Sequence, residues 1–316
     1  MKKAFEKLNL RDYGVLLGFL ALCIAISIAT PSFLGKQNIL NLLRQSSIIG
    51  IISAGMTFVI ISGNFDISVG AVAALAGAIT MKFATGGTNL FASMLLGVAI
   101  CAVIGLINGI VVAKINVPSL IATMAMVTIV RGLLLMLTGG YPITENIPIL
   151  DYIGNGYLFS IPIPVVIFFI VVLASFIVLN KTKFGRYVYS VGGNQEASKL
   201  NGINVDSHKV KVFIINAVLA GIAGIVLTGR LGTATAIAGE GYDMDAIASV
   251  VIGGISVAGG SGSVLKTVIG VLLMSVINNS FNLLGIDVYF QYIFKGLIIL
   301  AAVGFDSYSK KKLASR

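Results

Sequence analysis

The chain has 316 residues, of which 57% are hydrophobic and only 11% are charged, and its mean hydropathy is +1.00. This composition lies far outside that of water-soluble globular proteins and indicates a membrane protein. The net charge of +10 does not indicate nucleic-acid binding, because most of the basic residues are confined to three segments of the chain.

Long stretches without Asp, Glu, Lys or Arg are predicted to form the membrane-spanning elements. They cover residues 13–30, 46–65, 83–113, 132–144, 152–180, 212–229, 246–265 and 267–286. Most of them are long enough for a spanning helix of about 20 residues, and the longest must bend or break. The stretches are continuous, whereas strands of a membrane barrel alternate in segments of roughly ten residues. We therefore predict an all-α polytopic protein, a single transmembrane domain with about ten helices.

The three basic segments predict the orientation in the membrane. They are the N-terminal tail (Lys2, Lys3, Lys7, Arg11), residues 181–211, and the C-terminal tail (Lys310, Lys311, Lys312, Arg316). By the positive-inside rule all three face the cytoplasm. Residues 139–161 contain Glu145 and Asp151 but no Lys or Arg, so they fit the outside. The chain is thus divided into helices within 12–180, a cytoplasmic loop 181–211, helices within 212–306 and a cytoplasmic tail 307–316.

Charged residues within or beside the apolar stretches are candidates for function, because a charge inside a membrane is costly and needs a partner or water. Asp66, Arg131 and Lys295 belong to this group. Asp66 precedes a stretch rich in small residues, and its carboxylate is expected to cap a helix that begins near Ile67.

The same two interpretations, helix cap or translocation pathway, apply to a larger set. Asp243 and Asp245 are expected to cap the helix that follows them, with a pathway role as the alternative. The complete candidate set is Asn64, Phe65, Asp66, Asn108, Arg131, Asp243, Asp245, Asn278 and Asn279.

Two parts of the sequence hint at an internal repeat. The segments around Asp66 and Asp243 both place a glycine and an acid before a stretch of small residues, and Asn108 in LINGI is similar to Asn278 in VINNS. With the predicted topology the two halves have opposite orientations, as in many transporters. The 37 glycines are explained mainly by close helix packing.

No complete catalytic, nucleotide-binding or metal-binding motif is found. Residues 260–267, GSGSVLKT, are one glycine short of a phosphate-binding loop because Leu265 stands in its place, and no strand is predicted before them. His208, the only histidine, lacks Cys or acidic residues at ligand spacing. We therefore expect no catalytic residue, no metal and no cofactor bound by this chain.

Five segments together resemble one family. They are GMTFVIISGNFDISVGAVAALAGAI (55–79), PSLIATMAMVTIVRGLLLMLTGGYPI (118–143), GRYVYSVGGNQEASKLNGINV (185–205), DAIASVVIGGISVAGGSGSVLKTVIG (245–270) and NNSFNLLGIDVYFQYIFKGLIIL (278–300). They closely resemble ribose-type permease subunits of bacterial ABC sugar importers, and the resemblance covers residues 33–305. Asn64 and Lys266 depart from it, because the family usually has glycine at both positions.

The resemblance implies a permease that lies in the bacterial inner membrane with both termini in the cytoplasm. It also implies a partner ATPase that binds ATP and Mg, an extracytoplasmic binding protein that delivers ribose or a related monosaccharide, and a second permease copy. Glu196, Ala197 and Ser198 followed by Gly202 spell E-A-S-x-x-x-G, close to the family's ATPase-docking segment. The implied ATPase-coupling residues are Gly192, Gly193, Asn194, Glu196, Ala197, Ser198, Gly202 and Ile203.

A physical expectation follows for this segment. Residues 193–202 are expected to form a short helix, capped by Asn194, that lies in a groove of the ATPase. The chain has no tryptophan and few polar residues inside the apolar stretches, which favours a weakly binding conduit for the sugar.

Two other classes of protein remain as alternatives. In an ion-coupled secondary transporter of a small polar solute, Asp66, Arg131, Asp243 and Lys295 carry protons or ions. A membrane protein with a purely structural role is the third hypothesis. The E-A-S-x-x-x-G segment has no role in the secondary transporter, which favours the ABC permease.

Overall fold

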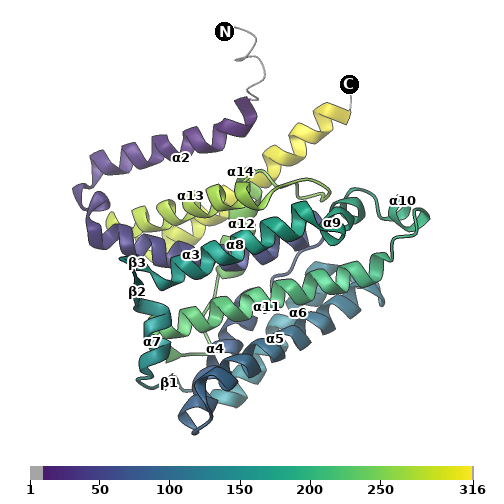
Figure 1. Ribbon diagram of the computed structural model, residues 1–316. Coiled ribbons are helices and arrows are strands. Elements are labelled where there is room, and N and C mark those ends of the chain that lie inside the picture. Colours follow the sequence, from purple (N-terminus) through teal and green to yellow (C-terminus); the bar gives the residue numbers. More distant parts are fainter. Residues whose placement is uncertain (1–9, 315–316) are drawn as a thin grey trace.

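The computed structural model of the protein describes residues 10–314 and consists almost entirely of helices (Figure 1). The helices are α2 (Leu10–Ala29), η1 (Pro31–Leu34), α3 (Lys36–Ile61), α4 (Val69–Thr85), α5 (Leu90–Ala113), α6 (Ser119–Thr138), α7 (Pro148–Asn155), α8 (Ile163–Lys181), α9 (Lys183–Gly193), α10 (Gln195–Leu200), α11 (Val205–Leu231), α12 (Tyr242–Ile252), α13 (Val264–Leu283) and α14 (Val288–Ala314). Of the basic tails, Lys2, Lys3, Lys7 and Arg316 lie outside the described residues.

Four two-residue strands complete the fold. Strand β1 (Ile143–Thr144) pairs antiparallel with β4 (Thr233–Ala234), with Ile143 opposite Ala234. Strand β2 (Tyr157–Leu158) forms a hairpin with β3 (Ile161–Pro162). These strands form two small two-stranded sheets, which connect helices at one end of the molecule.

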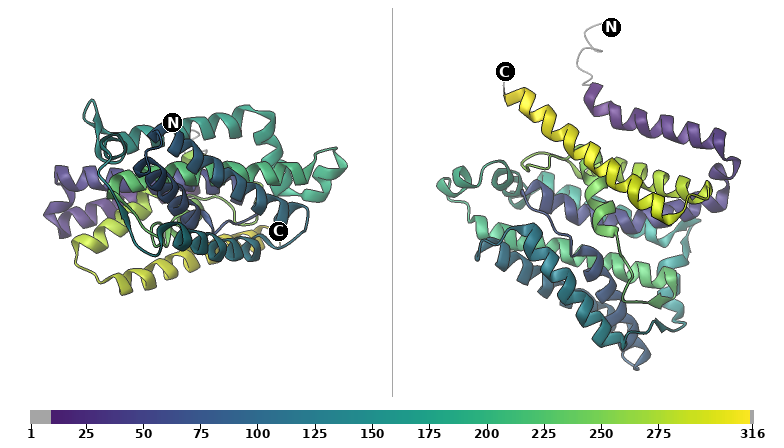
Figure 2. Two further views of the ribbon diagram at one scale, coloured as in Figure 1. Left: turned by 90° about the horizontal axis from the view of Figure 1, so that it is seen from below. Right: turned by 180° about the vertical axis from the view of Figure 1, so that it is seen from behind.

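The predicted all-α polytopic fold is confirmed. Six helices, α3, α5, α6, α8, α11 and α13, are long and apolar enough to cross a membrane. Shorter apolar helices cover Val15–Ala29, Val69–Thr85 and Val288–Gly304. Figures 1 and 2 place α2 and α14 on one side of the molecule and α4 and α5 on the other, with α3, α8 and α11 between them.

The long helices run between two ends of the molecule, which we call the α10 end and the α7 end (Figure 1). At the α10 end the last residue of α3 meets the loop before α13, where the Gly260 amide donates to the Ile61 carbonyl over 2.8 Å. At the α7 end Arg44, near the start of α3, donates to the Asn155 carbonyl of α7 over 3.0 Å. The start of α2 and the end of α14 both point toward the α10 end.

Glycines allow α4 and α11 to touch along their backbones. A Cβ atom on Gly224 of α11 would lie 1.8 Å from the Ala73 carbonyl oxygen of α4, and one on Gly77 would lie 1.9 Å from Oγ1 of Thr228. No side chain fits at either position, so the glycines set the distance between these helices. The predicted packing role of the glycines is confirmed here.

The first of two similar three-helix sets consists of α11, α4 and α5. Helix α4 runs parallel to α11, since Ala73 lies beside Gly224 and Gly77 beside Thr228. Helix α5 runs antiparallel to α11, since Gly109 near its end packs on Val210 near the start of α11.

The second set, α3, α12 and α13, has the same arrangement. Helix α13 runs antiparallel to α3, because Thr57 near the end of α3 lies 2.7 Å, Oγ1 to Oγ1, from Thr267 near the start of α13. Helix α13 also runs antiparallel to α12, where Ser249 packs on Gly270 and Asp245 contacts Asn278. Because α3 and α11 run in opposite directions, the two sets are inverted relative to each other, which supports the predicted repeat.

One stretch predicted to hold a spanning helix is interrupted by a loop. Residues 246–265 do not form one spanning helix, because α12 ends at Ile252 and a loop follows up to Ser263. In this loop Gly254 and Gly259 have φ of 87° and 83°, a conformation that glycine adopts easily and that ends a helix. Within the predicted cytoplasmic segment 181–211 the structure has helices α9 and α10 and the start of α11 at Val205.

Candidate functional site

A short helix, α10, forms within the segment predicted to contact an ATPase. The Asn194 side chain accepts a hydrogen bond from the Ala197 amide over 2.9 Å at the start of the helix. The helix ends near Gly202, whose φ of +78° turns the chain toward α11. The predicted short helix and its cap are therefore confirmed, while its partner stays a prediction.

Side-chain hydrogen bonds hold α10 against its two neighbours. Ser198 is buried, and its Oγ lies 2.8 Å from the Oγ of Ser190 in α9. Lys209 of α11 donates to Oε1 of Gln195 over 2.9 Å. Helix α10 is therefore bonded to both α9 and α11.

The outer face of α10 is open to solvent. The Glu196 side chain is 81% exposed and lies 3.3 Å from the Lys199 ammonium, and Ala197 is also exposed. Leu200 is 89% exposed, although it is a large apolar residue. Our sequence reasoning missed Leu200, although an apolar residue between Lys199 and Asn201 in a polar segment is a signal for a contact surface. Ile203 is half-buried behind it.

Backbone contacts at three glycines join α9 to the loop between α12 and α13, and we call this the glycine junction (Gly192, Gly193 and Gly260). A Cβ atom on Gly192 would lie 1.7 Å from the Ile61 carbonyl oxygen, and one on Gly260 would lie 2.7 Å from the Cα of Gly193. Nearby, burial raises the pKa of the Tyr189 phenol, which donates to the Gly262 carbonyl over 3.0 Å. Helix α9 thus packs directly on the end of α3 and on the loop before α13.

Asp66 lies at the centre of a buried polar cluster. Its Oδ1 accepts hydrogen bonds from the amide of Ser68 over 2.9 Å and from the hydroxyl of Ser68 over 2.6 Å. Its Oδ2 accepts from Asn216 of α11 over 2.9 Å, and Asn108 of α5 donates to the Ser68 hydroxyl over 3.1 Å. The predicted cap role of Asp66 is wrong, because α4 begins at Val69 with Ser68 in the N-cap position. Among the described residues the Asp66 carboxylate accepts from Ser68 and Asn216, not from an amide of α4.

A second buried cluster surrounds Asp245. The Lys295 ammonium of α14 lies 2.9 Å from Oδ1 and 3.1 Å from Oδ2 of Asp245, and Asn278 donates to Oδ2 over 3.4 Å. The predicted cap role is wrong here, because Gly241 is the N-cap and Asp243 and Asp245 lie in the first turn of α12. Asp245 instead joins α12 to α13 and α14 by charge and hydrogen bonds.

The two clusters correspond to each other in the inverted repeat. Asn108 lies five residues before Ala113, the last residue of α5, and Asn278 lies five residues before Leu283, the last residue of α13. Each asparagine is tied to the acid of its own half, directly or through Ser68. The Asp66 cluster therefore lies nearer the α10 end and the Asp245 cluster nearer the α7 end.

Arg131 of α6 holds the segment between β4 and α12. Its guanidinium donates to the carbonyl oxygens of Ala236 and Ala238, the second over 3.0 Å, and it interacts electrostatically with Glu240 and Asp243. Arg131, Ala236, Glu240 and Asp243 line an open cavity of about 490 Å³ between α4, α6 and this segment. Glu240 is exposed, and the helices around it are apolar. Because a charged side chain is costly against lipid, this surface requires water or protein in front of it.

A second cavity, of about 270 Å³, lies between α12, α13 and α14 and shares Glu240 and Gly241 with the first. Asp245, Asn278 and Lys295 are among the residues that line it. The charged and amide groups of the second cluster thus border open space.

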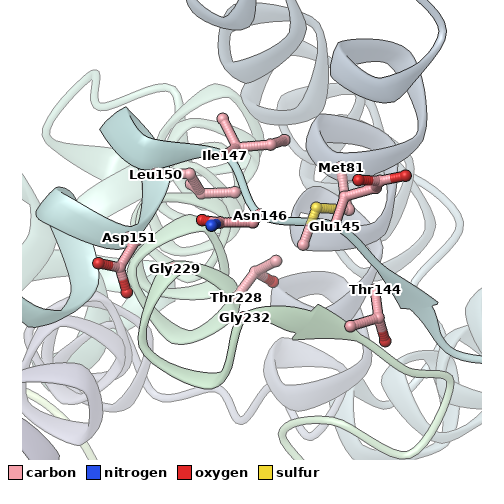
Figure 3. Close-up of a pocket in the computed structure, with 10 residues that line it drawn as sticks. All are labelled: Met81, Thr144, Glu145, Asn146, Ile147, Leu150, Asp151, Thr228, Gly229 and Gly232. Carbon is pink, nitrogen blue, oxygen red and sulfur yellow. The ribbon is translucent and has the colours of Figure 1, made fainter.

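A smaller cavity of about 220 Å³ lies at the α7 end (Figure 3). Glu145 and Asn146 from the segment after β1 and Asp151 of α7 face Thr228 and Gly229 of α11 across it. The two carboxylates belong to the segment predicted to lie outside the cell.

The remaining candidates stabilise local structure. Asn64 donates to the carbonyl and the hydroxyl of Ser62 over 3.2 Å each, and the Phe65 amide donates to Ser119 Oγ over 3.1 Å. Asn279 and Asn38 exchange two hydrogen bonds of 2.8 and 3.0 Å, which join α13 to α3. No contact places these three residues in either cavity.

A family model described as "Branched-chain amino acid transport system / permease component" matches residues 38–303. The chain belongs to this permease family. The family and the apolar helices make it a multi-pass membrane protein and a transport permease subunit.

Curated relatives are similar over nearly the whole permease. The ribose import permease protein RbsC of Haemophilus influenzae is 43% identical over 303 residues, which cover 93% of this chain and 94% of the relative. The protein of the same name from Escherichia coli K12 is 39% identical over 310 residues, 97% of each chain. The xylose transport system permease protein XylH of H. influenzae is 34% identical, with 98% of this chain and 99% of the relative covered. No solved structure matches the permease.

The Asp66→Asn permease is expected to fold and to keep most of its transport, whereas Asp66→Leu is expected to lose folded yield. An asparagine can still accept from Ser68, and Asn216 can turn its amide, because its Oδ1 has no hydrogen-bond partner among the described residues. A leucine leaves the buried donors of Ser68 and Asn216 unpaired, at about 1–3 kcal/mol each.

Size-exclusion chromatography in detergent measures the folded yield of both variants, and uptake by the assembled transporter measures their activity. An Asn variant that folds normally but transports nothing would show that the charge of Asp66 acts in the pathway.

Proposed function

We propose that the permease is the membrane-spanning subunit of an ATP-binding cassette importer for a monosaccharide, with ribose as the substrate. The main support is the similarity to ribose import permeases at 39–43% identity over nearly the whole chain. Relatives named for xylose and L-arabinose transport are 34% and 35% identical, which favours ribose among the pentoses.

In this proposal the permease is not an enzyme and binds no cofactor. A cytoplasmic ATPase subunit binds ATP and Mg and contacts α10. The exposed Glu196, Ala197 and Leu200 form the contact surface, Asn194 and Gly202 set the start and end of α10, and Ser198 fixes it to α9. Gly192 and Gly193, as the α9 part of the glycine junction, pass its movement to Ile61 and Gly260, and Ile203 supports α10 from behind.

The α10 end is proposed to lie in the cytoplasm. Basic residues gather there in the described part of the chain: Lys114, Lys181, Lys183, Arg186, Lys199, Lys209, Lys211 and Lys266. The positive-inside rule then places the α7 end, with Glu145 and Asp151, outside the membrane. An extracytoplasmic sugar-binding protein docks at the α7 end, and both termini are cytoplasmic.

The sugar is proposed to cross between two copies of the permease in the inner membrane. The surface formed by α6, α12, α14 and the segment 236–241 carries the exposed Glu240 and both larger cavities, so lipid is a poor neighbour for it. A second copy covers this surface and leaves a polar passage, while lipid surrounds the other helices. ATP binding moves α10 and shifts the permease between outward-open and inward-open packings.

Copurification tests the composition of the transporter. The tagged permease, expressed with an ABC ATPase and a sugar-binding protein from the same organism, is expected to retain the ATPase in detergent and to bind the ribose-loaded binding protein. Isolation of the permease without an ATPase, under conditions that preserve its fold, would remove the support for this function.

A further inference from the structure

The cavity between α12, α13 and α14 lies inside the membrane-crossing part of the permease. Asn278 lies five residues before the end of α13 and Lys295 seven residues after the start of α14, so both are roughly 8–10 Å below the α7 end at 1.5 Å per residue. The cavity volume of about 270 Å³ is several times the 30 Å³ share of one water molecule in the liquid. One monosaccharide fits in this volume.

The lining of this cavity carries the groups that bind a neutral sugar. Carboxylate, amide and ammonium groups can bond hydroxyls, and tyrosine rings can pack against the C–H faces of a sugar ring. Among the residues that provide them are Gln45, Tyr242, Asp245, Asn278, Tyr292 and Lys295.

One buried acceptor in this lining has no donor. The Asn278 side chain is only 4% exposed, and its Nδ2 donates to Asp245. Its Oδ1 has no hydrogen-bond partner among the described residues. A buried amide oxygen without a donor is unfavourable, and a hydroxyl of a bound sugar can supply the donor.

The charges at the cavity favour a neutral ligand over a phosphorylated one. Lys295 is the cation of the lining, and its ammonium is already directed at both carboxylate oxygens of Asp245. Glu240 adds a second carboxylate at the rim. A phosphate group would have to compete with Asp245 for Lys295 and would meet the charge of Glu240.

We infer that this cavity is a low-affinity monosaccharide subsite, which holds the sugar after the binding protein releases it. The inference rests on the proposed function, because it takes ribose as the cargo. Asn278 and Tyr292 contact the sugar, and the Asp245–Lys295 pair forms one wall of the subsite. The partial opening of the cavity and the lack of tryptophan agree with weak binding, as transport requires a site that also releases its cargo.

Saturation-transfer NMR with D-ribose and the detergent-solubilised permease–ATPase complex, without the binding protein, tests the subsite. The wild-type complex is expected to give a ribose signal in the millimolar range. Asn278→Leu and Tyr292→Ala are expected to weaken the signal roughly tenfold, the factor that corresponds to about 1.4 kcal/mol. Ribose 5-phosphate is expected to compete poorly.

Tyr289→Ala is the matched control, because Tyr289 is 78% exposed, lies one turn before Tyr292 on α14 and does not line the cavity. Its signal is expected to equal that of the wild type. Full ribose signals from both Asn278→Leu and Tyr292→Ala, or no signal from a wild-type complex that imports ribose, would overturn the subsite but leave the proposed function intact. A complete transporter that imports no monosaccharide would instead refute the proposed function.

Discussion

Glu196→Lys and Gly202→Ala are each expected to uncouple ribose uptake from ATP hydrolysis while the permease still inserts and folds. The Glu196 side chain is 81% exposed, so reversing its charge disturbs a partner surface and not the core. Gly202 has φ of +78° and open space around its Cβ position, so alanine strains only the backbone that ends α10. Uptake in reconstituted vesicles is expected to fall roughly tenfold or more for each variant. A tenfold fall corresponds to a loss of about 1.4 kcal/mol in the coupling free energy between ATP hydrolysis and uptake.

Lys114→Glu is the control for this prediction, because Lys114 is exposed at the same end of the molecule but lies at the end of α5. It is expected to leave ribose-stimulated ATP hydrolysis near the wild-type rate. If Glu196→Lys and Gly202→Ala both retain normal stimulation and uptake, α10 is not the coupling element.

Asp245→Leu is expected to destabilise the permease strongly, and the double variant Asp245→Leu with Lys295→Leu is expected to recover most of the loss. Removing one member of a buried ion pair leaves the other charge unpaired, at about 3–5 kcal/mol. Lys295 retains 21% side-chain exposure, so the lower end of this range applies. The double variant removes both charges, which is close to neutral in other buried pairs.

The melting midpoint in detergent measures this effect, with Glu145→Leu, an exposed acid in the segment after β1, as a control for loss of one acid. The single variant is expected to melt roughly 5–10 °C below the wild type. Equal losses in the single and double variants would mean that Asp245 and Lys295 do not stabilise each other.

The sequence alone predicted features that depend on neighbouring residues. Asn194 ahead of Glu196 and Ala197 was sufficient to predict the cap and the short helix, because an N-cap bond joins residues three apart. The predicted correspondence between Asn108 and Asn278 is also confirmed, because both lie at the same position in equivalent helices of the repeat.

Contacts between distant residues could not be predicted in the same way. Asp66 and Asn216 are 150 residues apart, and Asp245 and Lys295 are 50 apart, so no local pattern indicates that they meet. The prediction for residues 246–265 failed for another reason: the stretch has no charged residue, but its second half, GGISVAGGSGS, is rich in glycine and serine, and these residues signal the break.

The energy source of uptake tests the central claim most directly. Vesicles that contain the permease with its ATPase are loaded with ATP and given ribose-charged binding protein, with and without an ionophore. We predict uptake that requires ATP and the binding protein and persists when the ionophore removes the ion gradients. Uptake that continues without ATP and collapses with the ionophore would contradict the ABC importer and identify an ion-coupled secondary transporter.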